Sequence, residues 1–159
     1  MKTMMFAALL AMATTAGCAR QDHQRQGEVE VSVAWARATP PGAPVAGGFL
    51  TVRNRGTADE RLLAVESGSA QRVEIHEVRH EDGMARMRQV EDGLPVPAGQ
   101  TVVLEPGGYH LMFIQPVKAF EAGDRIAATL VFEKAGRLPV QFEVRPLAAM
   151  APEADHHHH

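Results

Sequence analysis

Hydrophobic and polar residues alternate with a period of two along most of the chain after residue 27, which is typical of half-buried β-strands. In the run EVEVSVAWAR, this alternation places Val29, Val31, Val33 and Trp35 on one face of the first predicted strand. No run beyond the N-terminal leader has a helical period. The pattern therefore predicts an all-β domain.

Turn residues separate these runs at the short intervals of a β-sandwich or barrel, and about nine short strands result. Residues 39–44 are predicted to form a loop, because two adjacent prolines cannot donate hydrogen bonds to a sheet. Residues 71–90 are predicted to form a hairpin that turns at 81–83. The last strand pair is expected to turn at 134–136.

Residues 1–18 have the features of a bacterial signal peptide, with a positive charge before a short apolar stretch at 4–13. This stretch is too short to span a bilayer comfortably as a helix. The sequence TAGC resembles a lipobox in which Cys18 is lipidated, although Thr15 stands where leucine is usual, and ordinary cleavage is the alternative. Either route predicts a protein of the periplasm or cell envelope, which contacts a membrane only through a lipid anchor.

Composition divides the remainder into a linker at 19–27, a single domain at 28–146 and a disordered, His-rich tail at 147–159. The formal net charge of −3 gives no electrostatic case for binding nucleic acid, and a monomer is expected. Cys18 is the only cysteine, so the mature domain has neither a disulfide nor a thiolate ligand. The sequence shows no catalytic triad, carboxylate pair or phosphate loop, which predicts a binding protein and not an enzyme.

The segment GGYHLMFIQP carries His110 and Met112 two positions apart in a predicted strand. Tyr109, Leu111 and Phe113 share one face of this strand, and the last two form the natural core pair. His110 and Met112 are therefore expected to point away from the core, where both can reach a single ion.

His76 lies on the more polar face of its own predicted strand, and Met87 follows the hairpin turn. Two imidazoles and two thioethers suit Cu(I), which is a soft ion, and they need no thiol in an oxidising compartment. Binding would weaken as the pH falls through the histidine range, because the imidazoles must be deprotonated. The alternative is that the methionines fill core gaps and the histidines are ordinary strand residues.

Two segments, WARATPPGAPVAGGFLTVRN and VEIHEVRHEDGMARMRQVEDGLPVPAGQTVVLEPGGYHLMFIQP, resemble the PCu(A)C family of extracytoplasmic copper chaperones. The resemblance covers nearly all of residues 28–146. The family signature is a His, then a Met, then a His-x-Met pair at characteristic spacings.

In this chain ten residues separate His76 from Met87, and a further twenty-two lead to His110, which stands one residue before Met112 in the HLM triplet. Glu77 stands where some members have an additional methionine. The resemblance implies a cupredoxin-like Greek-key β-sandwich or barrel that holds Cu(I) through these two histidines and two methionines.

The resemblance also implies delivery of copper to the Cu(A) centre of cytochrome c oxidase, through the subunit that carries Cu(A) and sometimes alongside a Sco-type protein. The lack of a thiolate in the domain excludes a blue-copper electron carrier. Two alternatives are copper buffering or resistance in the periplasm, and a metal-free β-sandwich interaction module.

The remaining candidates are weaker. His23 in the linker is expected to be solvated, His80 to be exposed, and Met84 either to flank the site or to pack. The C-terminal tail is either an inert extension or tag, or a lower-affinity Cu(II) site made of Met150, His156, His157, His158 and His159.

Overall fold

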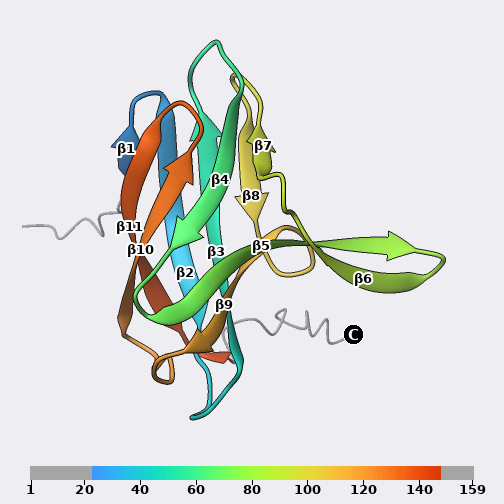
Figure 1. The fold of residues 1–159 in the computed structure, drawn as a ribbon, viewed down its shortest axis with the longest axis vertical. Helices are drawn as coiled ribbons and strands as arrows, with labels where there is room; N and C mark the ends of the chain where they lie inside the picture. The colour runs from blue at the N-terminus through green and yellow to red at the C-terminus, as the bar shows by residue number, and fades with distance from the viewer. Residues whose placement is uncertain (1–22, 148–159) are drawn as a thin grey trace, which may run out of the picture.

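The structure is a computed structural model, and it describes residues 23–147. This part of the chain is built from eleven strands (Figure 1). In chain order they are β1 (Gln24–Gln26), β2 (Val29–Arg37), β3 (Val45–Asn54), β4 (Glu60–Glu66), β5 (Ala70–Glu81), β6 (Met84–Gln89), β7 (Leu94–Val96), β8 (Thr101–Leu104), β9 (His110–Pro116), β10 (Arg125–Phe132) and β11 (Gly136–Arg145).

Seven of the strands form a closed barrel in the order β2–β11–β10–β4–β5–β9–β3, and pairing of β3 with β2 closes it. Only the β11–β2 pair is parallel among the described pairings. The other four strands each extend the barrel at one strand: β1 beside β2, β6 beside β5, β7 beside β4 and β8 beside β3. The predicted all-β, cupredoxin-like fold is confirmed.

The prediction of about nine strands missed β1 and β7. Gln24–Gln26 lies inside the segment expected to be a linker, yet it pairs with the start of β2 after a turn at Gly27, whose φ is +58°. Such a strand is held by backbone hydrogen bonds and has no apolar face for the sequence to reveal. His23, expected to be solvated on its own, places Nδ1 2.9 Å from Oε1 of Glu30.

The leader at 1–18, Cys18, and the tail residues Met150 and His156–His159 lie outside the described residues. Within residues 23–147, no helix is both long and apolar enough to cross a membrane.

Aromatic rings meet edge to face at the centre of the barrel. The ring centroid of Phe113 lies 5.4 Å from that of Phe120 and 5.6 Å from that of Phe142, and all three side chains are fully buried. Leu111 is also fully buried, so the predicted core face of β9 is confirmed.

The prediction that Val33 and Trp35 share the buried face of Val29 and Val31 is wrong. Val29 and Val31 are buried, but Val33 is 45% exposed and has a φ of +53°. The ladder to β3 shifts at this point, which is the geometry of a β-bulge. The bulge reverses the alternation, so Trp35 turns outward and its ring centroid lies 4.4 Å from that of Phe49.

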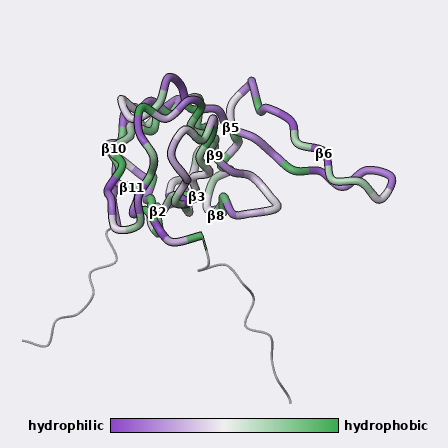
Figure 2. Tube along the Cα trace, turned by 90° about the horizontal axis from the view of Figure 1, so that it is seen from below, coloured by the Kyte–Doolittle hydropathy of each residue, from purple (hydrophilic) through white to green (hydrophobic). Residues whose placement is uncertain are grey.

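The outer half of β5 and the whole of β6 project from the barrel as a hairpin (Figure 1). The hairpin turns at Asp82 and Gly83, whose φ angles of +53° and +75° are those of a type I′ turn, so the predicted hairpin is confirmed. Every residue of β6 is exposed, and Figure 2 shows the arm standing clear of the barrel with mostly hydrophilic residues.

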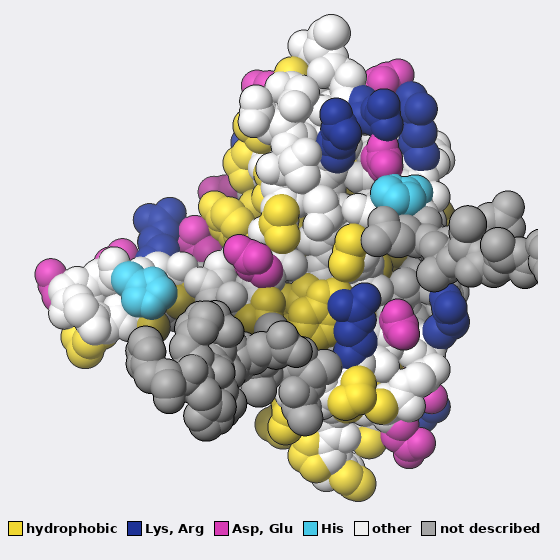
Figure 3. All heavy atoms as spheres, turned by 180° about the vertical axis from the view of Figure 1, so that it is seen from behind, with side chains coloured by type: hydrophobic (Ala, Val, Ile, Leu, Met, Phe, Trp, Pro, Cys, Tyr) yellow, Lys and Arg dark blue, Asp and Glu magenta, His cyan; other side chains and the backbone are white. Residues whose placement is uncertain are grey.

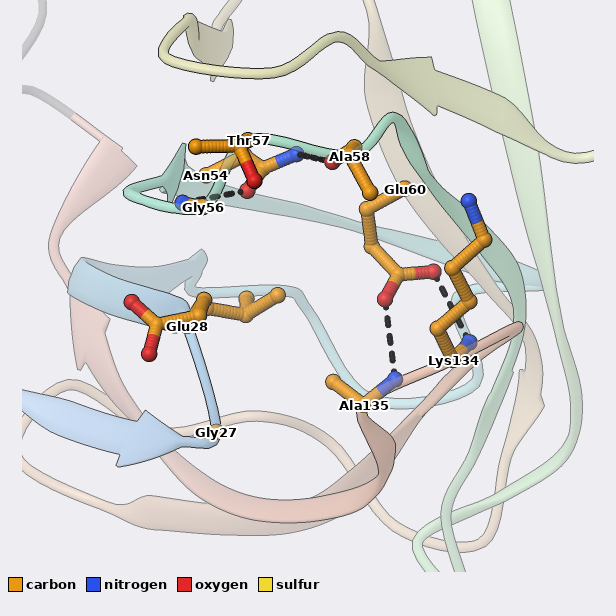
Figure 4. A pocket seen from close by; sticks show the side chains of 10 residues that line it. Gly27, Glu28, Asn54, Gly56, Thr57, Ala58, Glu60, Lys134 and Ala135 are labelled. Atoms are coloured by element: carbon orange, nitrogen blue, oxygen red, sulfur yellow. Dashed lines mark hydrogen bonds between the residues drawn. The ribbon is translucent and has the colours of Figure 1, made fainter.

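A hollow of about 310 Å³ lies at one end of the barrel and contains the buried carboxylate of Glu60 (Figure 4). Oε1 of Glu60 accepts hydrogen bonds from the backbone N–H groups of Arg61 and Lys134 at 2.8 and 3.0 Å, and Oε2 accepts one from Ala135 at 2.8 Å. The carboxylate is thus used by the fold, because it joins β4 to the β10–β11 turn.

We expect Glu60→Gln to lower the free energy of unfolding at pH 7 by about 2 kcal/mol, because an amide cannot accept all three bonds. Burial raises the pKa of the Glu60 carboxyl, but the three backbone donors and the nearby Lys134 outweigh it and hold this pKa below its usual range. Because the pKa of Glu60 is lower in the folded protein than in the unfolded chain, its carboxylate stabilises the fold at pH values above the unfolded-state pKa. This stabilisation is lost as the pH falls through the folded-state pKa.

Urea unfolding of wild type and variant between pH 7 and pH 3 measures this contribution. The difference between the two proteins should shrink towards the acid end. A difference that stays constant with pH would contradict the charge of Glu60 as its source. Glu133→Gln, an exposed carboxyl near the same turn, is the control.

Candidate metal centre

Cross-strand pairing brings the two predicted histidine ligands together. His76 on β5 is the direct partner of His110 on β9, and their ring centroids lie 5.8 Å apart. Met112 follows two residues after His110 on the same face of β9, opposite Glu74. The alternation of both strands therefore places His76, His110, Glu74 and Met112 on one face of the sheet, as two adjacent cross-strand pairs.

Met87 reaches the same face from the projecting hairpin. It is the partner of Val78, which lies two residues beyond His76 on β5, so both methionine candidates share the face of the histidines. The Met87 side chain is 57% exposed, whereas His110 is 7% exposed. The candidate site thus has a buried side on the barrel and an open side on the hairpin.

A hollow of about 240 Å³ lies between the barrel wall and the base of the hairpin. Met87, His110 and Met112 line it, whereas His76 lies beside it as the cross-strand partner of His110. The other lining residues are Arg37, Gly47, Phe49, Val78, Pro106 and Gly107.

Hydrogen bonds fix which nitrogen of each imidazole carries the lone pair. Nδ1 of His110 lies 3.1 Å from the carbonyl oxygen of Gly108, so Nδ1–H donates and Nε2 keeps the lone pair. Nε2 of His76 lies 2.8 Å from Oε2 of Glu74, so Nε2–H donates and Nδ1 keeps the lone pair. Nδ1 of His76 is buried without a hydrogen-bond partner in the structure.

Glu74 holds His76 in this orientation as an ionised carboxylate. Hydrogen bonds from His76 and from Arg72, at 2.8 and 2.6 Å, lower the pKa of the Glu74 carboxyl and outweigh the opposing effect of burial. A carboxylate that orients one ring nitrogen and leaves the other free is the usual support of a metal-binding histidine.

A wall of stacked rings and guanidinium groups borders the hollow. The guanidinium carbon of Arg37 lies 5.9 Å from the ring centroid of Phe49, and that of Arg145 lies 5.3 Å from the ring centroid of Trp35. In Figure 3, exposed hydrophobic side chains lie beside Lys or Arg side chains on the barrel face next to the hairpin.

Our sequence reasoning did not identify Glu74, Arg37 or Phe49 as part of the candidate site. Glu74 was within reach, since it lies two positions from His76 on the same strand face. Arg37 and Phe49 come from β2 and β3, and only the three-dimensional pairing brings them to the hollow.

The minor candidates lie further from the hollow. His80 is exposed, as expected, and it pairs with Ala85 on the face of the hairpin that carries Met87. Met84 is 55% exposed and pairs with Glu81, which places it on the opposite face.

The hollow and the adjacent His76 together offer two imidazoles and two thioether sulfurs. Among residues 23–147, no group of three or more His, Cys, Asp and Glu side chains is arranged to hold a metal ion. The donor set of this face is thus a mixed imidazole and thioether set, which is soft and neutral.

Comparisons with known proteins agree with this architecture. Residues 29–144 match the family described as "Putative lipoprotein LpqE-like". The chain is 33% identical over 117 residues to "Putative lipoprotein Lxx21020" of Leifsonia xyli subsp. xyli (strain CTCB07), a match that covers 74% of this chain and 69% of that protein.

Two solved structures share the fold. The copper-bound PCuAC domain from PmoF2 superposes with a TM-score of 0.65 at 26% identity, over 78% of this chain and 97% of that one. The Cu(I) form of DR1885 from Deinococcus radiodurans gives a TM-score of 0.59 at 25% identity, over 82% of this chain and 83% of that one. The chain therefore belongs to the LpqE-like family, and its barrel has the fold of PCuAC domains.

Proposed function

We propose that this chain is an extracytoplasmic Cu(I)-binding chaperone that holds its ion through His76, Met87, His110 and Met112. The observation that carries the proposal is the buried, unpartnered Nδ1 of His76 beside a hollow lined by the other three residues. A buried nitrogen without a partner costs free energy, and a metal ion would remove that cost. A metal-free packing role would leave this atom unexplained.

The donor set suits Cu(I) because thioethers are soft and neutral and because both imidazoles carry a directed lone pair. Copper is the cargo here, and no redox or proton chemistry is required of the protein. The copper-bound structural neighbours support the choice of metal.

The open side of the hollow suits a protein that passes its ion on. Met87 stands on the solvent-exposed hairpin, so a second protein can reach the ion from that side. We propose the Cu(A) centre of cytochrome c oxidase as the destination, either directly or through a Sco-type protein.

The lipoprotein relatives support export and lipid anchoring, and we propose lipidation at Cys18 in the cell envelope. The terminal histidines at 156–159, with Met150, remain a proposed secondary Cu(II) site. The proposed tail site shares no residue with the hollow, and the loading experiment distinguishes copper bound at the tail from copper bound in the hollow.

Metal analysis after loading with Cu(I) under reducing conditions tests the proposal. The full chain and a variant that ends at Leu147 should each retain one Cu(I) after gel filtration. Loss of all copper on removing the tail would show that the hollow does not bind the ion. Loading with Zn(II) tests whether the site prefers a soft ion, and the truncated chain should retain far less Zn(II) than Cu(I).

A further inference from the structure

The outer edge of β6 is a free strand edge. Among residues 23–147, β6 pairs only with β5. The backbone N–H of Val90 donates to the carbonyl of Ile75 at 2.8 Å, and the β5–β6 register continues from this pair. Because hydrogen-bonded pairs alternate in an antiparallel ladder, the backbone groups of Ala85, Met87 and Gln89 point away from β5.

This edge lies directly beside a proposed copper ligand. The Met87 side chain lines the hollow, while its backbone N–H and C=O point towards solvent. A strand added to the edge would place alternate side chains about 5 Å from Met87 on the copper face. Addition of an extended segment to a sheet edge is a common mode of peptide recognition.

The opposite face of the hairpin is basic along β6, where it carries Arg86 and Arg88, whereas β5 adds Arg79 together with Glu77 and Glu81. Arg79 and Arg86 face each other across the strands, and Arg88 lies on the same face. Glu77 pairs with Arg79 at 2.8 Å and with Arg88 at 2.9 Å, whereas Arg86 reaches Glu81 only at 4.0 Å. On an added strand, the side chains that point away from the copper face would therefore lie beside these arginines.

The same arginines disfavour a second copy of the chain on this edge. Antiparallel pairing of two β6 strands about Met87 would set Arg86 of one copy opposite Arg88 of the other. Like charges in direct cross-strand positions are destabilising, and edge charges are a common defence against self-association. Acidic side chains in the same positions would instead complement the arginines.

We propose that the free edge of β6 docks an extended, acidic segment of the protein that receives copper, with a soft side chain of that segment placed beside Met87. The inference rests on the proposed function. The hand-over is a ligand exchange: the bond from Cu(I) to the Met87 sulfur breaks as a bond to a sulfur of the segment forms. Copper stays Cu(I), and a thioether-for-thioether exchange releases no proton.

The probe is a synthetic nine-residue peptide in which glutamate and threonine alternate around a central methionine, with a lysine-for-glutamate peptide as its counterpart. Calorimetry measures binding of each peptide to the Cu(I)-loaded full chain. The acidic peptide should bind at least tenfold more tightly than the basic one. Amide exchange at Ala85, Met87 and Gln89 should slow when the acidic peptide is bound.

Two variants test the site without touching a proposed ligand. Ala85→Pro removes one outward N–H, and proline is tolerated where an edge strand faces solvent. Arg86→Glu reverses the charge on the basic face. Each variant should lower the affinity for the acidic peptide at least tenfold and leave the Cu(I) affinity unchanged.

The matched controls are Thr101→Pro and Arg53→Glu. Thr101 occupies an outward position on the free edge of β8, as shown by the N–H of Asn54 donating to Gln100 at 2.9 Å, and Arg53 is an exposed arginine on β3. Neither should change peptide binding.

Three results would overturn the docking proposal: equal binding of the acidic and basic peptides, equal effects of test and control variants, or a dimer in sedimentation that Ala85→Pro abolishes. If Ala85→Pro fails to fold, Arg86→Glu decides alone. Cu(I) binding by wild type without peptide binding sinks only the docking proposal, whereas absence of Cu(I) binding sinks the proposed function.

Discussion

Replacing His110 and Met112 together with alanine is expected to lower the Cu(I) affinity of the chain on the order of a thousandfold, because half of the proposed donor set is removed. Both residues belong to β9 and line the hollow, so the remaining His76 and Met87 would face an open space. Competition with a chromogenic Cu(I) chelator under reducing conditions measures the change.

A matched control is Gln141→Ala with Glu143→Ala, two exposed residues that also lie two positions apart, on β11. This control should bind Cu(I) as wild type does. Equal and weak binding by wild type and by the His110 and Met112 double variant would refute the site. Thermal unfolding of each metal-free protein shows whether the variants are folded, so that a lower Cu(I) affinity can be assigned to the missing ligands.

Phe113→Ala is expected to lower the free energy of unfolding by about 3–5 kcal/mol, which is a large share of the stability of an ordinary domain. The Phe113 side chain is fully buried between the rings of Phe120 and Phe142, so its removal leaves a cavity at the centre of the barrel. Urea unfolding followed by fluorescence of Trp35 measures the effect.

Val117→Ala, at a side chain that is 76% exposed, is the control and should change the unfolding free energy by less than about 0.5 kcal/mol. A loss below about 1 kcal/mol in Phe113→Ala would mean that the barrel collapses around the vacant space. The two experiments on β9 separate the roles of its faces, since one removes ligands and the other removes packing.

The alternation of β9 and β5 was readable from the sequence because a strand has a fixed period of two and the register of this strand pair stays constant from Arg72–Ile114 to His76–His110. That period put Leu111 and Phe113 on the core face and His110 on the other. The hairpin was equally readable, because Asp82–Gly83 favours a type I′ turn.

The missing parts depend on contacts between distant segments. Nothing local in the sequence marks the shift in the β2–β3 ladder, so the outward position of Trp35 and the contribution of Arg37 to the hollow were not predictable. The short strand β1 was missed because its three polar residues pair mainly through the backbone. The short strand β7 was missed because proline stands at the middle of its three residues, although Leu94 and Val96 are buried in the core. The lone pair of His76 became visible only once Glu74 was seen to occupy the other ring nitrogen.

The bulge at Val33 is one extra residue in β2, because two residues of β2 stand opposite one residue of β3 at this point. Deleting Val33 would therefore restore the strict alternation of β2 while Trp35 keeps Phe49 as its partner. Ala36, which is fully buried, would stay in the core, and Arg37 would stay at the wall of the hollow. The loss of one codon at the bulge would thus preserve the lining of the site, whereas the loss of one codon within the regular ladder of β2 would move residues to the opposite face.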